Sequence, residues 1–305
     1  MSLPIYNQDL GIIGILAQSA TTYTDCITFT GETSDFTLTA TNKEWDGTVE
    51  YSTDHNTWTV WNGSEISSSS QKLYLRGSGN TTLYTNSGAQ FVLSARAACS
   101  GNIQTLLEYS NPPTTISVNY CYQGMFYQCT NLTTAPELPA TTLTIGCYWD
   151  MFNGCTNLTA APALPATTLA SNCYTHMFEG CTNLTTAPEL PATTLANRCY
   201  MRMFYGCTSL TKAPALPATT LAQYCYYYMF SGCSSLKISA TQSSEYSTAW
   251  RIPSSGTISS TPSNWNTDML TNTGGTFTSN PSINTTYYGA FSSSTAGYTG
   301  TVTPL

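Results

Sequence analysis

The chain has 305 residues, of which 41% are hydrophobic and only 8% carry a charge. Its formal net charge is −7, and nine Lys and Arg residues are too few for a phosphate-binding face, so the composition excludes a nucleic-acid-binding protein. The length allows two or three modest domains. Residues 1–25 come first and contain a short apolar run from Leu10 to Leu16 with Asp9 directly before it. We interpret this segment as an assembly or anchor segment rather than a secretion signal, because no Lys or Arg precedes the run.

Residues 26–98 predict a small antiparallel β-sandwich of the immunoglobulin-like kind. Short runs with alternating apolar and polar residues, such as "CITFTG", "GTVEYSTD" and "KLYLRGSGN", are separated by Asp-Gly, Asn-Gly and Gly-Ser-Gly. His55 lies in "STDHNTW", where we interpret it as a solvated residue of a hairpin turn. "GNIQTLLEY", after Cys99, predicts a short helical piece that caps the next region.

A 26-residue repeat dominates residues 99–240. Two cysteines recur in each copy, and ten of the twelve cysteines belong to the pattern. The first set is Cys121, Cys147, Cys173, Cys199 and Cys225, and the second is Cys129, Cys155, Cys181, Cys207 and Cys233. Four full copies run from residue 121 to residue 224, and a fifth stops near Leu236. Self-similarity at this period predicts a solenoid, in which each coil buries its apolar edge against its neighbours.

One copy reads as a helix followed by a short extended segment. Pro165 is a suitable first-turn residue and Gly180 a suitable terminator, so we predict a helix between them. At 100° per residue, Leu169, Cys173 and Met177 share one inward face. In the following "CTNLTTAPELP", Leu184 and Leu190 are the expected inward residues.

The same helical angles place the residues that change between copies on the outward face. They include Ser171, Asn172, Thr175, His176 and Glu179. Large aromatic side chains give contact area at low entropic cost, so we take this face as a candidate binding surface. Its candidate residues are Trp149, Asp150, His176, Glu179, Arg202, Tyr205, Tyr227 and Tyr228. Contact inside an assembly, or no specific role, are the alternatives. The tyrosine that follows the first cysteine of every copy is expected to be structural.

The repeat cysteines are expected to be reduced and buried, in two columns that line the core, because free Cys is among the most buried residue types. Disulfides within or between coils are an alternative, although many equivalent thiols at one spacing could mispair. Zinc is a weaker one, because Cys173-x-x-His176 is absent from the other copies.

Enzyme motifs are absent from the sequence. It contains no G-x-x-x-x-G-K-[ST] and no G-x-G-x-x-G, only two histidines, and no cluster of Asp and Glu that suggests a catalytic carboxylate pair. We therefore expect no enzyme activity, no catalytic residues, no cofactor, no metal and no membrane span. Residues 241–305 predict a closing cap and a tail rich in Ser, Thr and Gly.

The phrase "MFxGCTxLTxAPxLPATTLAxxCY" resembles the BspA-type leucine-rich repeats of bacterial surface proteins and of bacteriophage tail or fibre proteins. The resemblance covers residues 99–240 and implies a curved solenoid that serves in adhesion or recognition. We expect a phage virion protein, fibre or tail-associated, that assembles in the host cytoplasm and presents the repeats to a host-surface protein or glycan. Its other expected partners are virion proteins, reached through residues 1–25, and copies of itself in a homo-oligomer. A bacterial cell-surface adhesin and a purely architectural capsid or tail component are the alternatives.

Overall fold

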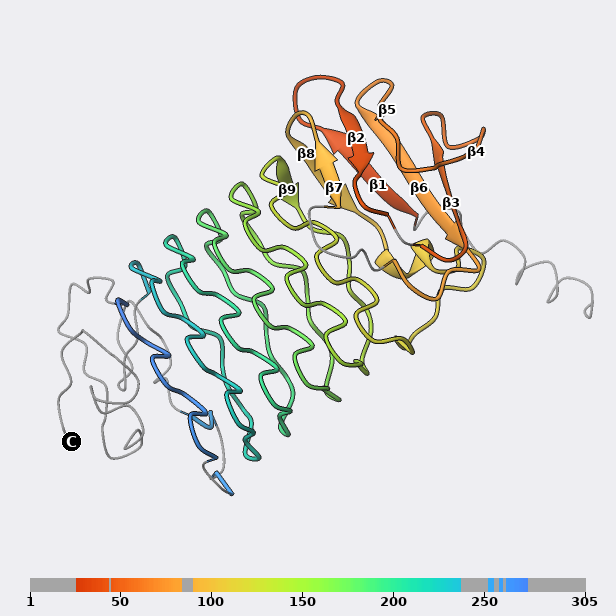
Figure 1. Ribbon diagram of the computed structural model, residues 1–305. Coiled ribbons are helices and arrows are strands. Elements are labelled where there is room, and N and C mark those ends of the chain that lie inside the picture. Colours follow the sequence, from red (N-terminus) through yellow and green to blue (C-terminus); the bar gives the residue numbers. More distant parts are fainter. Residues whose placement is uncertain are drawn as a thin grey trace, which may run out of the picture.

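The computed structural model describes residues 26–43, 45–83, 90–236, 252–254, 258–259 and 262–273. The predicted assembly segment (residues 1–25) and most of the predicted cap and tail (residues 241–305) lie outside the described residues. A group of β-strands occupies one end of the described chain, and a row of stacked coils extends from it (Figure 1). The described part is mainly β, with one short 3₁₀ helix, η1 (Ile103–Leu106), in the segment predicted as a helical cap.

The strands form a six-stranded sheet in the order β4-β3-β6-β1-β8-β9 and a three-stranded sheet in the order β5-β2-β7. Their bounds are β1 (Ile27–Gly31), β2 (Thr37–Ala40), β3 (Thr48–Ser52), β4 (Thr59–Val60), β5 (Ile66–Ser67), β6 (Lys72–Ser78), β7 (Phe91–Leu93), β8 (Ala97–Ser100) and β9 (Leu132–Thr134). Every pairing is antiparallel except that of β8 with β9. The prediction of short antiparallel strands is therefore confirmed.

Aromatic rings connect the two sheets. Phe29 of β1 lies 6.2 Å, centroid to centroid, from Phe91 of β7, and Trp61 lies 5.7 Å from the same ring. The Trp61 indole Nε1 donates to the Ser64 carbonyl at 2.7 Å, so its one polar atom is satisfied inside the core. Alternate residues of β1 are buried, as expected for a strand with one face on a core.

His55 is not a solvated turn residue, contrary to the sequence interpretation. It does occupy a turn, with a left-handed φ of 64°. Its ring, however, packs on Tyr74 at 4.7 Å between centroids, and its Nε2 lies 3.4 Å from the Cys26 Sγ. The turn folds back onto the sheet, and the imidazole fills the space beside the aromatic ring.

The predicted helix between Pro165 and Gly180 is wrong. A left-handed φ recurs at every fourth residue, at Asn172 (59°), His176 (55°) and Gly180 (72°), which no α-helix permits. Backbone amides alternate in direction between these points. Thr175 N donates within its own coil to Asn172 O at 3.2 Å, whereas His176 N donates to Met201 O of the next coil at 2.9 Å. Every second backbone amide between Asn172 and Gly180 thus donates a hydrogen bond to the neighbouring coil, as in a sheet.

This backbone turns two consecutive side chains inward and the next two outward. Cys173, Tyr174, Met177 and Phe178 are at most 1% exposed, and the predicted inward residues Leu184 and Leu190 are buried as well. The inward face is therefore confirmed at Cys173 and Met177, whereas Leu169, also predicted inward, is only half-buried. Thr175, which the helical angles placed outward, is fully buried, and its Oγ1 donates to Arg198 O at 2.7 Å.

Equivalent inward residues stack directly on one another along the array. The Phe rings lie 5.4–5.6 Å apart and the Tyr rings 5.7–6.0 Å apart, all within 15° of parallel. The Phe column is Phe126, Phe152, Phe178, Phe204 and Phe230, and the Tyr column is Tyr122, Tyr148, Tyr174, Tyr200 and Tyr226. Each ring is the packing surface for the next, so every copy requires the same residue. We call the stacked coils from residue 119 to residue 236 the repeat array.

All twelve cysteines are buried free thiols, as predicted for the ten in the repeat array. The second column also has a hydrogen-bonding role: Cys181 Sγ donates to Phe152 O of the preceding coil at 3.1 Å, and Cys155, Cys207 and Cys233 repeat the contact. Burial raises the pKa of the Cys173 thiol to about 12. Cysteine therefore serves as a small buried donor that stays protonated at neutral pH.

The strands and the repeat array share one core. Phe126, at the start of the Phe column, lies 5.5 Å from Phe91 and 6.4 Å from Phe29, centroid to centroid. Phe91 N also donates to Met125 O at 3.0 Å, so the backbone ladder of the coils continues into the strands. The two regions meet where β9 joins the six-stranded sheet beside β8 (Figure 1).

One further coil closes the described part of the array. Tyr226 N donates to Trp265 O at 2.7 Å and Phe230 N to Met269 O at 2.9 Å, in the pattern of the earlier coils but 14 residues later in the chain. Trp265 caps the Tyr column with its ring edge on Tyr226 at 6.1 Å. We call residues 264–273 the closing coil. It lies in the segment that the sequence assigned to a cap.

Candidate functional site

Each coil has three left-handed positions, and both the first and the middle one carry large side chains in most copies; the first position includes Tyr120, Arg198 and Tyr224. The third position is glycine in four copies: Gly154, Gly180, Gly206 and Gly232. The middle position holds Asp150, His176, Arg202, Tyr228 and Asp268, with φ between 52° and 56°, and only the first copy has glycine there, Gly124. A left-handed φ costs a residue with a Cβ roughly 1–2 kcal/mol, so these side chains are present against the preference of the backbone.

The side chains of the middle position, together with Glu179, form a chain of acidic and basic groups across three coils. His176 Nδ1 lies 3.3 Å from Asp150 Oδ1 and 3.8 Å from Glu179 Oε2. Arg202 Nη1 continues the chain at 3.9 Å from Glu179 Oε1. The Asn153 amide donates to Asp150 Oδ1 at 2.8 Å and fixes that carboxylate from its own coil. Acidic and basic groups thus alternate along the array.

Glu179 lies at the centre of this chain. Burial raises the pKa of its carboxyl group, while His176 and Arg202 act in the opposite direction and Asp150 adds to the rise. Its Oε2 is buried and accepts no hydrogen bond from the described residues. The carboxylate is therefore only partly neutralised by its neighbours and keeps an acceptor for a further group.

Aromatic side chains continue the surface toward the closing coil. The Arg202 guanidinium lies 5.1 Å from the Tyr205 ring centroid and 5.3 Å from that of Tyr228, within the range of cation–π attraction. Tyr227 packs edge-on against Tyr228 at 4.5 Å. A hydrogen bond from the Tyr228 hydroxyl to the Asp268 carboxylate raises the pKa of that hydroxyl to about 12.

The opposite end contains Trp149, whose ring stands perpendicular to that of His176 at 6.4 Å between centroids. The Trp149 Nε1 and the His176 Nε2 are both buried and have no hydrogen-bond partner among the described residues. An unmet buried polar group costs about 1–3 kcal/mol. Water or a ligand group that reached these atoms would recover part of that cost.

The eight sequence-predicted residues come together as one continuous surface. All of them are half-buried rather than fully outward, and several contact one another within a coil or between neighbouring coils. We call this surface, with Asp268, the variable strip. Sequence reasoning missed Asp268 because the longer connection hides the closing coil. A sequence signal for this coil does exist: Asn264, Asp268 and Asn272 follow one another at intervals of four residues, as the left-handed positions of each coil do. Asn and Asp are the non-glycine residues that tolerate a left-handed φ best.

The strip has the chemistry of a binding surface: aromatic faces, a guanidinium and carboxylates held in place by one another. Among the described residues, no group of three His, Cys, Asp or Glu side chains is arranged to hold a metal ion. No helix in the described part of the chain is long and apolar enough to cross a membrane.

Residues 119–249 match the family described as BspA type leucine rich repeat region, in six copies. The repeats of this segment are therefore similar to BspA-type leucine-rich repeats, as the repeated phrase indicated. No curated protein and no solved structure matches the chain.

Proposed function

We propose that the protein is a non-enzymatic phage virion protein, fibre or tail-associated, and that its variable strip binds a host-surface protein or a glycan. The middle left-handed position carries this proposal. Glycine would satisfy the backbone there at no steric cost, as Gly124 does in the first copy, yet the other coils hold Asp, His, Arg and Tyr. Binding gives these side chains a role that outweighs their conformational cost.

The stacked coils suit this role in a second way. The core columns fix the position of every coil, so side chains can vary at the strip without disturbing the fold. The ion pairs and ring contacts hold the side chains in place before a partner arrives, which lowers the entropy lost on binding. The alternating charges and aromatic faces suit a partner that offers both polar groups and flat apolar faces, as sugars and protein surfaces do.

The virion assignment rests on the resemblance of the repeats to those of phage tail and fibre proteins, together with the low charge of the chain. A bacterial cell-surface adhesin would use the same strip in the same way. A purely architectural capsid or tail component would need the strip only for contacts inside its assembly.

Replacing Trp149 and Tyr228 by Ala tests the proposal. Both side chains are half-buried, so we expect the double variant to fold and to lose about 1 kcal/mol of stability. Its binding to a glycan array and its adsorption to bacterial cells should fall by tenfold for each 1.4 kcal/mol of lost contact energy. A variant with Val60 and Val92 replaced by Ala is the matched control, because it removes exposed apolar surface in the strands.

Unchanged binding of the double variant would move recognition away from the strip. If the control variant lost binding equally, exposed apolar surface in general would be responsible. Loss of particle assembly with intact glycan binding would favour the architectural alternative.

A further inference from the structure

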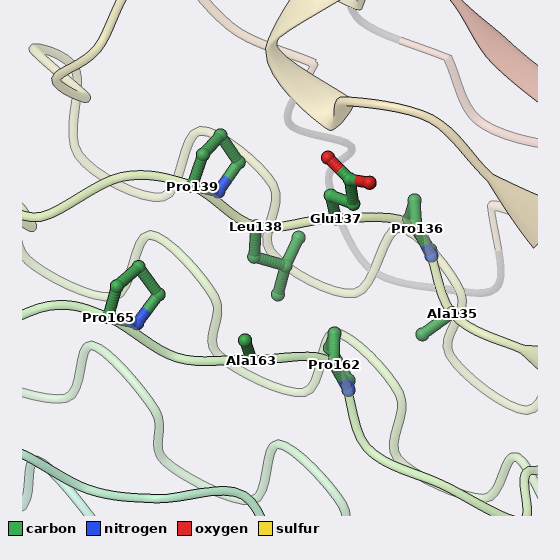
Figure 2. Close-up of a pocket in the computed structure, with 8 residues that line it drawn as sticks. All are labelled: Ala135, Pro136, Glu137, Leu138, Pro139, Pro162, Ala163 and Pro165. Carbon is green, nitrogen blue, oxygen red and sulfur yellow. The ribbon is translucent and has the colours of Figure 1, made fainter. Parts of the chain in front are cut away.

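A cavity of about 380 Å³ lies on a different part of the coils from the variable strip. It is formed by two segments, residues 135–139 of the first copy and residues 162–165 of the second (Figure 2). Figure 2 shows Pro136 beside Pro162 and Pro139 beside Pro165, with Leu138 and Ala163 between them. The volume is within the range of ligand pockets in proteins.

Proline leaves a backbone carbonyl unpaired at the cavity, and Pro188 and Pro214 occupy the equivalent places of the later copies. After the last copy, Ser254 N donates to Leu216 O at 2.8 Å and ties its segment to that copy. The residue at the equivalent place opposite Leu138 is Pro162, which has no N–H to donate. No hydrogen bond of the described residues ends on the Leu138 carbonyl oxygen. The two segments are therefore not joined at this point, and an acceptor is left at the cavity.

The walls are apolar and contain one charge. Four prolines, two alanines and Leu138 supply the surface, and Glu137 is the charged lining residue. Glu137 is exposed, and its carboxylate pairs with no Lys or Arg among the described residues. At the equivalent position of the second copy, Ala163 leaves the adjoining space empty.

We propose that this cavity, the proline pocket, receives an arginine side chain from an extended segment of a partner protein. The three methylene groups of arginine would pack on the proline rings while the guanidinium pairs with the Glu137 carboxylate in bidentate fashion. The Leu138 carbonyl accepts a further guanidinium N–H. A chain with a net charge of −7 attracts such a cationic partner over longer distances.

Other ligand classes fit less well. Anions would be repelled by the unpaired Glu137 carboxylate and by the net negative charge of the protein. A sugar needs several polar partners, and the walls offer few. A purely apolar ligand would bury the carboxylate without a partner, which is costly. The proline pocket shares no residue with the variable strip, so this proposal stands apart from the proposed function.

Methyl NMR tests the proposal, with Leu138 labelled as the reporter inside the proline pocket. The probe is an acetylated Gly-Gly-Arg-Gly-Gly amide, and its neutral counterpart carries citrulline in place of arginine. We expect the Leu138 methyl signals to shift and saturate with the arginine peptide. The citrulline peptide should bind at least tenfold more weakly, because it keeps the shape but lacks the charge.

Two substitutions separate the charge from the walls. Glu137→Gln should weaken the arginine peptide at least tenfold and abolish its advantage over citrulline. Ala163→Leu adds an exposed side chain that fills the proline pocket, and should abolish the response to both peptides. Glu65→Gln is the control, because it removes one exposed carboxylate remote in the fold, directly before β5.

Equal affinity for the two peptides, or an unchanged arginine affinity in Glu137→Gln, would overturn the proposal. A loss of affinity in Glu65→Gln as large as that in Glu137→Gln would also overturn it, because general charge attraction would then explain the binding.

Discussion

The strands and the repeat array reach the same kind of buried core by opposite means. The strands pair residues that are far apart in sequence, and their core uses a different side chain at each place, among them Phe29, Trp61 and Phe91. The array uses the same few side chains in every coil and stacks each on its copy. Specific packing in the first region therefore depends on many unlike contacts, whereas in the second it depends on one contact repeated.

The difference has a consequence for sequence variation. In the strands, a change of one residue alters contacts with several different partners. In the array, the core columns keep the same residue from copy to copy, while the residues of the variable strip differ. A repeat array thus separates the residues that fold from the residues that recognise more cleanly than the two sheets do.

The largest expected effect on this comparison comes from alkaline pH. An unfolded thiol ionises near pH 9, and burial raises the pKa of Cys173 and Cys225 to about 12. Below pH 9 the thiols are protonated in both the folded and the unfolded chain, so they do not change the free energy of unfolding. Above pH 9 the unfolded chain releases protons that the folded array retains, so stability falls, by roughly 2–3 kcal/mol per such thiol at pH 11. Because ten of the twelve cysteines lie in the array, we expect it to unfold first.

Urea unfolding followed by circular dichroism from pH 7 to pH 11.5 checks this prediction. Replacing Cys173 by Ala should remove the contribution of one thiol to the pH dependence of the free energy of unfolding. A stability that stays constant to pH 11 would show that the thiols are not desolvated as the structure places them.

A second effect concerns the junction of the two regions. Phe126 joins both cores, so Phe126→Ala should lower the free energy of unfolding by about 3–5 kcal/mol. It should also separate the unfolding of the strands from that of the array, because the shared core is then interrupted. Urea unfolding followed at tryptophan fluorescence and at far-ultraviolet circular dichroism checks this. Coincident transitions would mean that the backbone ladder alone couples the regions.

Most of the fold could be predicted from the sequence where a pattern has one physical meaning. Runs of alternating apolar and polar residues, separated by Gly-rich turns, predicted short antiparallel strands. The 26-residue period predicted that every copy has the same inward residues. The helix was wrong because "CYTHMF" repeats its apolar pairs every four residues, close to the 3.6 of a helix. Over Cys173 to Cys181 a helix drifts by 80°, and the fixed glycine at Gly180 with Asn172 eight residues earlier favours a left-handed turn instead.

The candidate residues do lie at the surface, but the helical geometry that placed them there is wrong. His176 and Glu179 were placed outward by helical angles, and they lie at the surface because the coil turns outward twice in every four residues. The contacts between copies could not be derived, because they depend on the coil spacing. The proline pocket was missed for a related reason: a missing N–H at Pro162 matters only once Leu138 is known to lie opposite.

A smaller effect distinguishes the two kinds of glycine. Gly180 has a left-handed φ, and an added Cβ would meet nothing closer than 3.8 Å, so Gly180→Ala should cost about 1–2 kcal/mol. In the strand region, a Cβ at Gly77 would overlap the Leu106 carbonyl, so Gly77→Ala should cost more. Thermal unfolding of both variants measures the difference. Equal losses would indicate that the array is as tightly packed at its turns as the strands are.

The smallest expected effect tests whether the variable strip is kept for folding or for recognition. His176→Gly removes two ion-pair contacts of a half-buried side chain, worth at most about 1 kcal/mol, and relieves a left-handed φ of similar cost. Glycine also makes the unfolded chain more flexible, at a cost of about 0.4–1 kcal/mol. These three contributions to the free energy of unfolding nearly cancel, so the melting temperature should hardly change.

Thr39→Gly on β2 is the matched variant in the strand region. Thr39 is half-buried like His176, but its extended backbone gains nothing from glycine, so this change should cost about 1 kcal/mol. If His176→Gly instead lowered the free energy of unfolding by more than about 2 kcal/mol, the contacts of His176 with Asp150 and Glu179 would be needed to hold neighbouring coils together. A neutral His176→Gly that binds glycans or cells more weakly would assign the side chain to recognition, because the backbone of its coil is then shown to prefer glycine.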